Sequence, residues 1–236
     1  ISSSIAQNNG TVYWEPFLND TFDAGSPMTC PAAPACLSPV GGEVISTSTV
    51  ICPGTHQLSA GITIGASNIT VECNNSVIKR SGAGTLLTVS TYTNVTIKNC
   101  VLSNASYGID TIAAQANYFI NNTMTNFGTA AIRLNNAKNQ VIDGNNISSD
   151  RWGVYGQGTS DRNNITNNIL SNNYEYGVYF SSSSNNRLLN NTITANSIAG
   201  VFIQNGANNA LNYNNIYNNP VNLNNSQFTL VNATDN

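Results

Sequence analysis

The feature that most constrains this chain is an asparagine that stands two residues before an apolar residue and recurs six times, at intervals of 22 to 24 residues. A fixed period in this range is typical of a solenoid, in which each repeat buries its apolar face only against its neighbours. We expect the asparagines to stack from coil to coil through their side-chain amides. The apolar residues are Val101, Met124, Ile147, Ile169, Ile193 and Ile216, and the asparagines are Asn99, Asn122, Asn145, Asn167, Asn191 and Asn214.

A small residue followed by a β-branched one recurs later in each unit, and apolar and polar residues alternate after it. Short alternating runs bounded by Asn, Ser and Gly indicate strands and turns, and no stretch has the apolar spacing of a helix-bearing repeat. The sequence therefore predicts an all-β fold, a right-handed parallel β-helix with about 23 residues per coil. The recurring pairs are Gly108 and Ile109, Ala131 and Ile132, Gly153 and Val154, Gly177 and Val178, and Gly200 and Val201.

The chain divides into two parts by composition. Residues 1–40 are rich in Ser, Asn, Pro and Ala, and they include an aromatic and apolar patch with Val12, Trp14 and Phe17. We expect an extended N-terminal tail or cap here. Residues 41–236 are expected to form one β-helix of about eight coils, with no linker inside it.

Three segments carry a resemblance to known proteins: PGTHQL (Pro53–Leu58), SNITVECNNSVI (Ser67–Ile78) and TNVTIKNCVLSNASYGI (Thr93–Ile109). Together with the repeats to about Asn219, they resemble the right-handed parallel β-helix repeat family. The chain is most similar to the NosD-like branch of secreted and cell-surface proteins, common in archaea. The resemblance implies the fold but no single activity, because members include sugar lyases, hydrolases, epimerases, binding modules and plain surface proteins.

Charge and hydropathy exclude some partners and favour an extracellular location. Only 8% of the residues are charged, against a usual figure of about 25%. The eight Lys and Arg form no basic stripe, so nucleic-acid binding is not expected. No apolar run approaches the ~20 residues that span a bilayer, so membrane insertion is not expected either. The first residue, Ile1, is consistent with removal of a leader or with an arbitrary fragment boundary.

Acceptor sequences for N-glycosylation (Asn-x-Ser/Thr) occur 12 times. We expect covalent N-glycans, first on those in bends or tails and second on those that alternate with inward residues along strands. The bend and tail sites are Asn19, Asn74, Asn104, Asn224 and Asn232, and the strand sites are Asn121, Asn146 and Asn190.

All five cysteines lie in the first 100 residues. Cys30 and Cys36 flank a Pro/Ala loop, which we expect a disulfide to close in an oxidising compartment. Cys73 and Cys100 stand at nearly equivalent places of adjacent coils, about 4.8 Å apart, which is within reach of a second bridge. Cys52 is then left over, although its pairing with Cys73 and a set of buried free thiols remain alternatives.

No catalytic or metal site is expected. The acids of the coils are Glu72, Asp110, Asp143, Asp150, Asp161 and Glu175. Polysaccharide hydrolases and lyases need clustered carboxylates, and no two of these acids share a position in successive coils, so we interpret them as solvated turn or surface residues. Asp110 and Arg133 should form a weak surface ion pair. The lone His56 offers no ligand cluster, so neither a metal nor a cofactor is predicted.

Aromatic residues recur at outward positions of successive coils: Trp152, Tyr155, Tyr176, Tyr179 and Phe202. Such a strip can stack on sugar rings or seat a partner subunit, or its rings can simply stack on one another. We prefer the partner subunit.

The ends of a β-helix suggest a function, because their unpaired strand edges attract other strands. An N-terminal segment that pairs with the edge of a second copy would build a head-to-tail filament. The main hypothesis is therefore a non-enzymatic extracellular structural protein, a glycosylated subunit of a cell-surface filament or sheath. The alternative is a secreted carbohydrate-binding or polysaccharide-processing module, with a cell-surface polysaccharide as ligand.

Overall fold

The computed structural model describes residues 7–8, 11–12, 35–226 and 232–236, which belong to two compact units, Ile1–Ala35 and Cys36–Asn236. In the first unit, strands β1 (Gln7–Asn8) and β2 (Thr11–Val12) pair antiparallel. Trp14, Phe17, Asn19 and Cys30 lie outside the described residues. The assembly role and the N-terminal domain boundary expected there therefore stay predictions.

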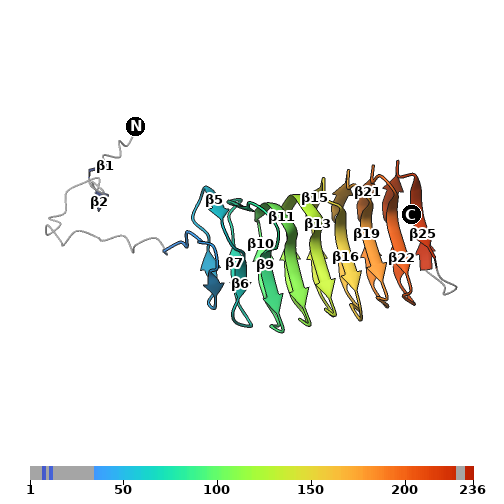
Figure 1. Ribbon diagram of the computed structural model, residues 1–236, viewed down its shortest axis with the longest axis horizontal. Coiled ribbons are helices and arrows are strands. Elements are labelled where there is room, and N and C mark those ends of the chain that lie inside the picture. Colours follow the sequence, from blue (N-terminus) through green and yellow to red (C-terminus); the bar gives the residue numbers. More distant parts are fainter. Residues whose placement is uncertain (1–6, 9–10, 13–34, 227–231) are drawn as a thin grey trace, which may run out of the picture. The chain divides into compact units, whose positions relative to one another are not determined.

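The second unit is the parallel β-helix that the repeat predicts (Figure 1). Each strand pairs in parallel with the equivalent strand of the next coil, as Ile142 of β14 does with Ile165 of β17. The described residues contain no helix, and hence no helix long and apolar enough to cross a membrane.

Strands of successive coils stack into three faces. The first face contains β4 (Thr49–Val50), β7 (Thr70–Glu72), β10 (Thr96–Lys98), β12 (Tyr118–Ile120), β14 (Val141–Asp143), β17 (Asn164–Thr166), β20 (Arg187–Leu189), β23 (Ala210–Asn212) and β26 (Asn232–Thr234). The second contains β5 (Thr55–Leu58), β8 (Val77–Arg80), β15 (Asn146–Ser148), β18 (Ile169–Ser171), β21 (Thr192–Thr194) and β24 (Asn215–Tyr217). The third contains β3 (Val44–Ile45), β6 (Ile62–Ile64), β9 (Thr85–Ser90), β16 (Trp152–Gln157), β19 (Tyr176–Ser181), β22 (Ala199–Gln204) and β25 (Val221–Asn225).

Two long strands join the second and third faces. Strands β11 (Val101–Ile112) and β13 (Thr123–Asn135) continue around the corner, so their first halves belong to the second face and their second halves to the third. The paired positions shift by one residue between Ala105 and Tyr107, which marks a bulge at this corner. This is the corner at which the groove described below opens.

The core is a set of apolar columns that run along the coils. The β-branched residues of the recurring pairs are fully buried, as predicted: Ile109, Ile132, Val154, Val178 and Val201. The preceding residue is glycine in four of these five pairs and Ala131 in the other. Packing requires the glycine at Gly153, since a Cβ there would lie 2.5 Å from the Gly177 carbonyl oxygen of the next coil. Inward and outward residues alternate within each strand, so the outer faces carry the polar and aromatic side chains.

The structure contains a ladder of asparagines, all buried except the last, Asn236. Two of the six asparagines that we predicted for it, Asn99 and Asn167, do not belong to it. The amides that bond from coil to coil are Asn122, Asn145, Asn168, Asn191, Asn214 and Asn236. Asn99 and Asn167 stand one residue before the ladder positions of their coils, which Cys100 and Asn168 occupy. Their side chains instead bond to Glu72 and Asp143, outside the core.

The apolar position of the repeat shifts in the same two coils. Leu102 and Leu170 are fully buried, whereas Ile169 is 47% exposed and Val101 is half-buried. The prediction failed there because both coils have two adjacent apolar residues, Val101 with Leu102 and Ile169 with Leu170. The ladder position after the predicted asparagine holds Cys100 in the first coil and a second asparagine, Asn168, in the other. A shift of one residue moves a strand residue to the opposite face.

Two disulfides fasten the first coils, and one of the predicted pairings is wrong. Cys73 and Cys100 are bonded as expected, with Cα atoms 4.8 Å apart. Cys36 pairs with Cys52 and not with Cys30. The reason is a strand bridge between Leu37 and Ile51. Because Cys36 directly precedes Leu37 and Cys52 directly follows Ile51, the bridge holds these two cysteines side by side.

Candidate functional site

The outer surface of the third face carries a cluster of aromatic side chains and an ion pair. Because the strands stack in register, outward residues of successive coils form rows along the β-helix. One row is Tyr107, Ala130, Trp152, Tyr176 and Ala199, and the next is Asp110, Arg133, Tyr155, Tyr179 and Phe202. These two rows bring together all five of the predicted aromatic residues in the coils.

We call Trp152, Tyr155, Tyr176, Tyr179 and Phe202 the aromatic face. Tyr179 stacks on Tyr155, with ring centroids 5.1 Å apart and an interplanar angle of 18°. It stacks on Phe202 at the same distance and 10°. The rings therefore pack on one another, and all five side chains remain half-buried. A contiguous patch of partly exposed aromatic rings is a candidate surface for binding a ligand.

An ion pair borders this face where the rows reach β11 and β13. The Arg133 Nε donates to Asp110 Oδ1 at 2.8 Å, and its guanidinium lies 3.9 Å above the Tyr107 ring. The prediction of a solvated Asp110 is wrong, because its side chain is only 2% exposed and the arginine covers it. Hydrogen bonding to Asp110 raises the pKa of Arg133, and the cation remains partly exposed beside the aromatic face.

A second ion pair holds Trp152 in place. Glu175 accepts hydrogen bonds from the Trp152 Nε1 and the Arg151 Nε, both at 2.8 Å. Arg151 also lies 4.6 Å from the centre of the Trp152 ring. Glu175 is thus a positioning residue for the aromatic face, rather than the plain turn residue that the sequence predicted.

The tyrosines of the face are proton donors. Burial raises the pKa of Tyr155 and of Tyr176, so both hydroxyls keep their protons in neutral solution. The Tyr179 hydroxyl donates to Gln204 Oε1 at 2.5 Å. The face therefore offers aromatic rings, phenolic donors and two arginines at its border, Arg133 and Arg151.

The remaining acids do not form a paired-carboxylate site in the part of the chain that the structure describes. Asp143 accepts from Thr166 and Asn167, and Asp161 accepts from the Ser184 backbone. Asp150 was predicted as a solvated turn residue, which is wrong, since it is fully buried. Residues 35–226 also hold no group of three or more potential metal ligands.

The sequon asparagines of the coils are placed where a glycan could be attached. Every predicted site in the described residues is exposed: Asn74, Asn104, Asn121, Asn146, Asn190, Asn224 and Asn232. Their modification remains a prediction, as does that of Asn19.

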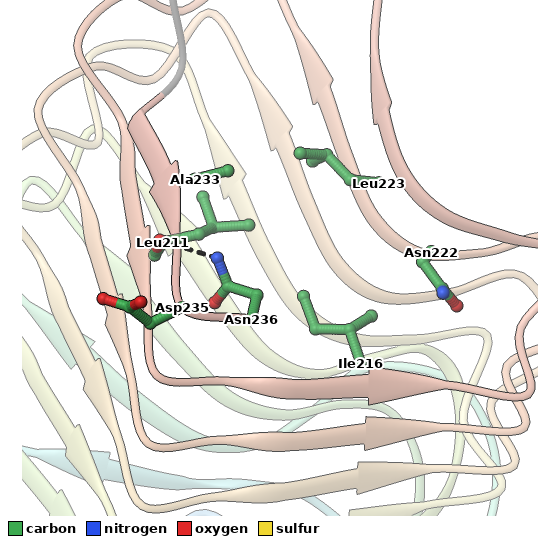
Figure 2. Close-up of a pocket in the computed structure, with 7 residues that line it drawn as sticks. All are labelled: Leu211, Ile216, Asn222, Leu223, Ala233, Asp235 and Asn236. Atoms are coloured by element: carbon green, nitrogen blue, oxygen red, sulfur yellow. Dashed lines mark hydrogen bonds between the residues drawn. The ribbon is translucent and has the colours of Figure 1, made fainter.

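A hollow of about 280 Å³ lies at the last described coil (Figure 2). The apolar residues that line it, Leu211, Ile216, Leu223 and Ala233, belong to columns of the core or to the strands that end them. Asn236 closes one side by donating to the Leu211 carbonyl at 2.9 Å. This hollow is the cross-section of the core at the end of the described coils.

Comparison with family models places this geometry in a known class. The model described as "Right handed beta helix region" matches residues 93–235, more than half of the chain. The chain belongs to the right-handed β-helix family. The NosD-like subtype is not distinguished by this match, and a comparison with curated proteins finds no match.

Three solved structures show what this β-helix protein is similar to. A variant of a periplasmic alginate epimerase gives a TM-score of 0.62 at 17% identity, over 80% of this chain and 49% of the epimerase. The A-module of a mannuronan C-5 epimerase from Azotobacter vinelandii gives 0.54 at 12%, over 83% and 76%. Endopolygalacturonase I from Stereum purpureum gives 0.51 at 14%, over 82% and 93%. The chain spans about half the length of the alginate epimerase that it matches.

These comparisons contradict the expectation of a non-enzymatic protein. The similar structures are enzymes whose names give alginate, mannuronan and polygalacturonate as their substrates. Because the identities are only 12–17%, the structural likeness establishes the fold alone. No finding supports a filament subunit.

The sequence analysis missed two residues near the aromatic face. Tyr107 has a readable signal, because it directly precedes Gly108, as Trp152 precedes Gly153 and Tyr176 precedes Gly177. Arg80 has none, since its position depends on a loop that interrupts the repeat.

Proposed function

We propose that this β-helix protein is a secreted enzyme that binds a polysaccharide along the aromatic face and modifies or cleaves it there. The observation that carries the proposal is the row of stacked, partly exposed rings of Tyr155, Tyr179 and Phe202, with the Arg133 cation at its border. An extended sugar chain can contact several such rings in succession, since they repeat at the spacing of the coils. The similarity of the fold to polysaccharide-processing enzymes supports this choice over an assembly surface.

The chemistry of the face favours proton transfer over hydrolysis. Hydrolysis of a glycosidic bond uses two carboxyl groups on either side of the bond. The described carboxylates of this face are Asp110 and Glu175, and each is already paired with an arginine. Proton transfer needs a group that carries the proton and a cation that stabilises the negative charge formed. The Tyr155 hydroxyl stays protonated because burial raises its pKa, so it can donate a proton to the sugar, and a solvent water takes the proton that leaves the sugar. The neighbouring Arg133 supplies the cation, and a uronic acid polymer is the substrate class whose carboxylate would face it.

The compartment is part of the proposal. Two disulfides in the first coils indicate an oxidising environment such as the periplasm or the cell exterior. The exposed sequons and the resemblance to the NosD-like branch fit the same location. Head-to-tail assembly through the segment with Val12, Trp14 and Phe17 remains a separate prediction, which light scattering on the purified chain would test.

A panel of polysaccharides tests the proposed function. The purified chain would be incubated with polymannuronate, polygalacturonate and a neutral glucan, with binding measured by calorimetry. Unsaturated products, new reducing ends and inversion at C5 would be followed by absorbance, a reducing-sugar assay and NMR. We expect binding and turnover of a polyuronate, both reduced by Tyr155→Ala. If no polymer binds, or if the variant acts like the wild type, the proposal is wrong.

A further inference from the structure

A second hollow lies apart from the aromatic face, at the corner between the second and third faces. It has a volume of about 480 Å³ and is lined by residues 80–83, 104–106, 126 and 128. Its floor and walls come from the loop after β8 and from the bulged corners of β11 and β13. We call it the corner groove.

Arg80 supplies the charge of the corner groove. Its Nη1 donates to the Thr85 carbonyl at 2.9 Å, which folds the side chain over the loop. Its Nε is buried and has no hydrogen-bond partner. Arg133 and Arg151 each pair with an acid, whereas Arg80 has no carboxylate partner among residues 35–226.

An arginine in this state has unused binding capacity. Besides this buried N–H, the half-buried Arg80 side chain lines the groove and carries a charge that no described acid neutralises, so an anionic group in the groove would pair with it. The planar guanidinium offers paired donors that match carboxylate and sulfate oxygens. The groove also presents the exposed amides of Asn104 and Asn126, which suit sugar hydroxyls.

Tyr107 lies between the corner groove and the aromatic face. Ser106 lines the groove and its Oγ accepts from the Gly84 N–H at 3.1 Å. The next residue, Tyr107, lies under the guanidinium of Arg133 at the border of the aromatic face. A sugar chain on that face therefore reaches the groove by passing Tyr107.

We propose that the corner groove is an anion subsite in which Arg80 binds a carboxylate or sulfate group of the polysaccharide. This inference rests on the proposed function, because it assigns the charge class of the same ligand. It makes two cations, Arg80 and Arg133, the determinants of specificity for an acidic polymer. A neutral glucan would leave the Arg80 charge without a counterion.

The test compares short oligosaccharides of equal length: an oligouronate, a sulfated oligosaccharide and a neutral one. We expect the wild type to bind one of the two anionic ligands at least tenfold more tightly than the neutral ligand, and which one identifies the group. Arg80→Gln should lose that advantage and keep its affinity for the neutral ligand. Arg187→Gln removes an exposed arginine from the first face and is the matched control, expected to bind as the wild type does.

Several results would overturn the subsite. Equal binding of anionic and neutral ligands by the wild type contradicts it, and so does an Arg80→Gln variant with the full anionic advantage. The subsite and the predicted glycan on Asn104 exclude each other, because that glycan would occupy the groove. A glycan found on Asn104 by mass spectrometry would therefore overturn the subsite, and an unmodified Asn104 is expected. Arg80→Lys keeps a cation near the loop but loses the paired donors of the guanidinium, so we expect a partial loss of affinity that is confined to anionic ligands. This variant tests the subsite even where Arg80→Gln fails to fold.

The two proposals can fail separately. If Tyr179→Ala abolishes binding of every oligosaccharide while Arg80→Gln changes none, the aromatic face binds sugar and the corner groove does not. If neither variant changes binding, the proposed function is wrong as well.

Discussion

Asn145 donates both its backbone N–H and its side-chain Nδ2 to the Oδ1 of Asn168 in the next coil, at 2.8 and 2.9 Å. The same Nδ2 reaches back to the Phe119 carbonyl at 2.8 Å. Each ladder amide thus pairs polar groups of the coils before and after it. Those groups are buried, so water cannot replace a missing partner. The ladder is therefore a chain of dependent contacts, and the loss of one member affects both neighbours.

The first prediction compares two adjacent asparagines. Asn168→Gly removes the acceptor used by Asn145 and should lower the free energy of unfolding by about 2–4 kcal/mol, since two or more buried groups lose partners. Asn167→Gly is the matched control. Asn167 is exposed with a φ of 56°, a conformation that glycine adopts readily, so its loss should cost less than about 1 kcal/mol. Urea denaturation measures both, and equal effects would contradict the ladder.

The second prediction concerns Asp150, which takes the place of an asparagine in another ladder. The following coils have Asn173, Asn196 and Asn219 at this position. The Asp150 Oδ1 accepts from the Phe127 N–H at 2.7 Å, but its Oδ2 is buried without a partner. Burial raises the pKa of Asp150 to about 8. If an asparagine stood at position 150, its side-chain nitrogen could donate to Asn173 Oδ1, just as Asn173 Nδ2 donates to Asn196 Oδ1 one coil later.

The sign of the pH dependence follows from this raised pKa. Between about pH 4 and 8 the folded protein keeps a proton that the unfolded chain releases, so wild-type stability falls as the pH rises through this range. Asp150→Asn does not titrate. We expect the variant to be more stable, with a gap that grows by at most roughly 1.4 kcal/mol per pH unit and is constant above about pH 8. Parallel stability curves for the two proteins from acid to alkaline pH would refute this.

The sequence was sufficient for the fold because the repeat is carried by buried residues. Ile132, Val154 and Val178 recur before the same alternation and are all fully buried. It was insufficient where two residues of the same kind are adjacent. Asn167 and Asn168 satisfy the pattern equally well, and only the pairing of the strands decides which one enters the core.

The candidate site was only partly predictable for a related reason. Equivalent outward positions identified Trp152, Tyr155 and Tyr179, because rows follow directly from the period. Burial of Asp110 under Arg133 depends on the length of the arginine side chain, which no period encodes. The corner groove depends on a bulge, where β13 has one residue more than β11, and on the loop after Arg80, both of which break the repeat.

The third prediction tests the aromatic face itself. Tyr179→Ala removes the ring that stacks on both Tyr155 and Phe202, and should weaken polysaccharide binding by about tenfold, which corresponds to roughly 1.4 kcal/mol. Tyr174→Ala is the control, because that ring is 64% exposed and precedes the strand that carries the face. Calorimetric titration compares the two. A similar loss in both variants would mean that the face has no special role.

The fourth prediction concerns the thiols. With Cys36 bonded to Cys52 and Cys73 to Cys100, one of the five cysteines, Cys30, has no partner left within the chain. Peptide mapping without reduction should give these two linked pairs and one alkylated Cys30. Cys36→Ser should free Cys52 and loosen the first coil, where the Leu37 bridge holds only one short edge. Proteolysis should then begin near residue 40 while the coils from Cys73 onward resist, because the second disulfide still fastens them. A Cys30–Cys36 peptide would reverse the assignment and leave Cys52 as the free thiol.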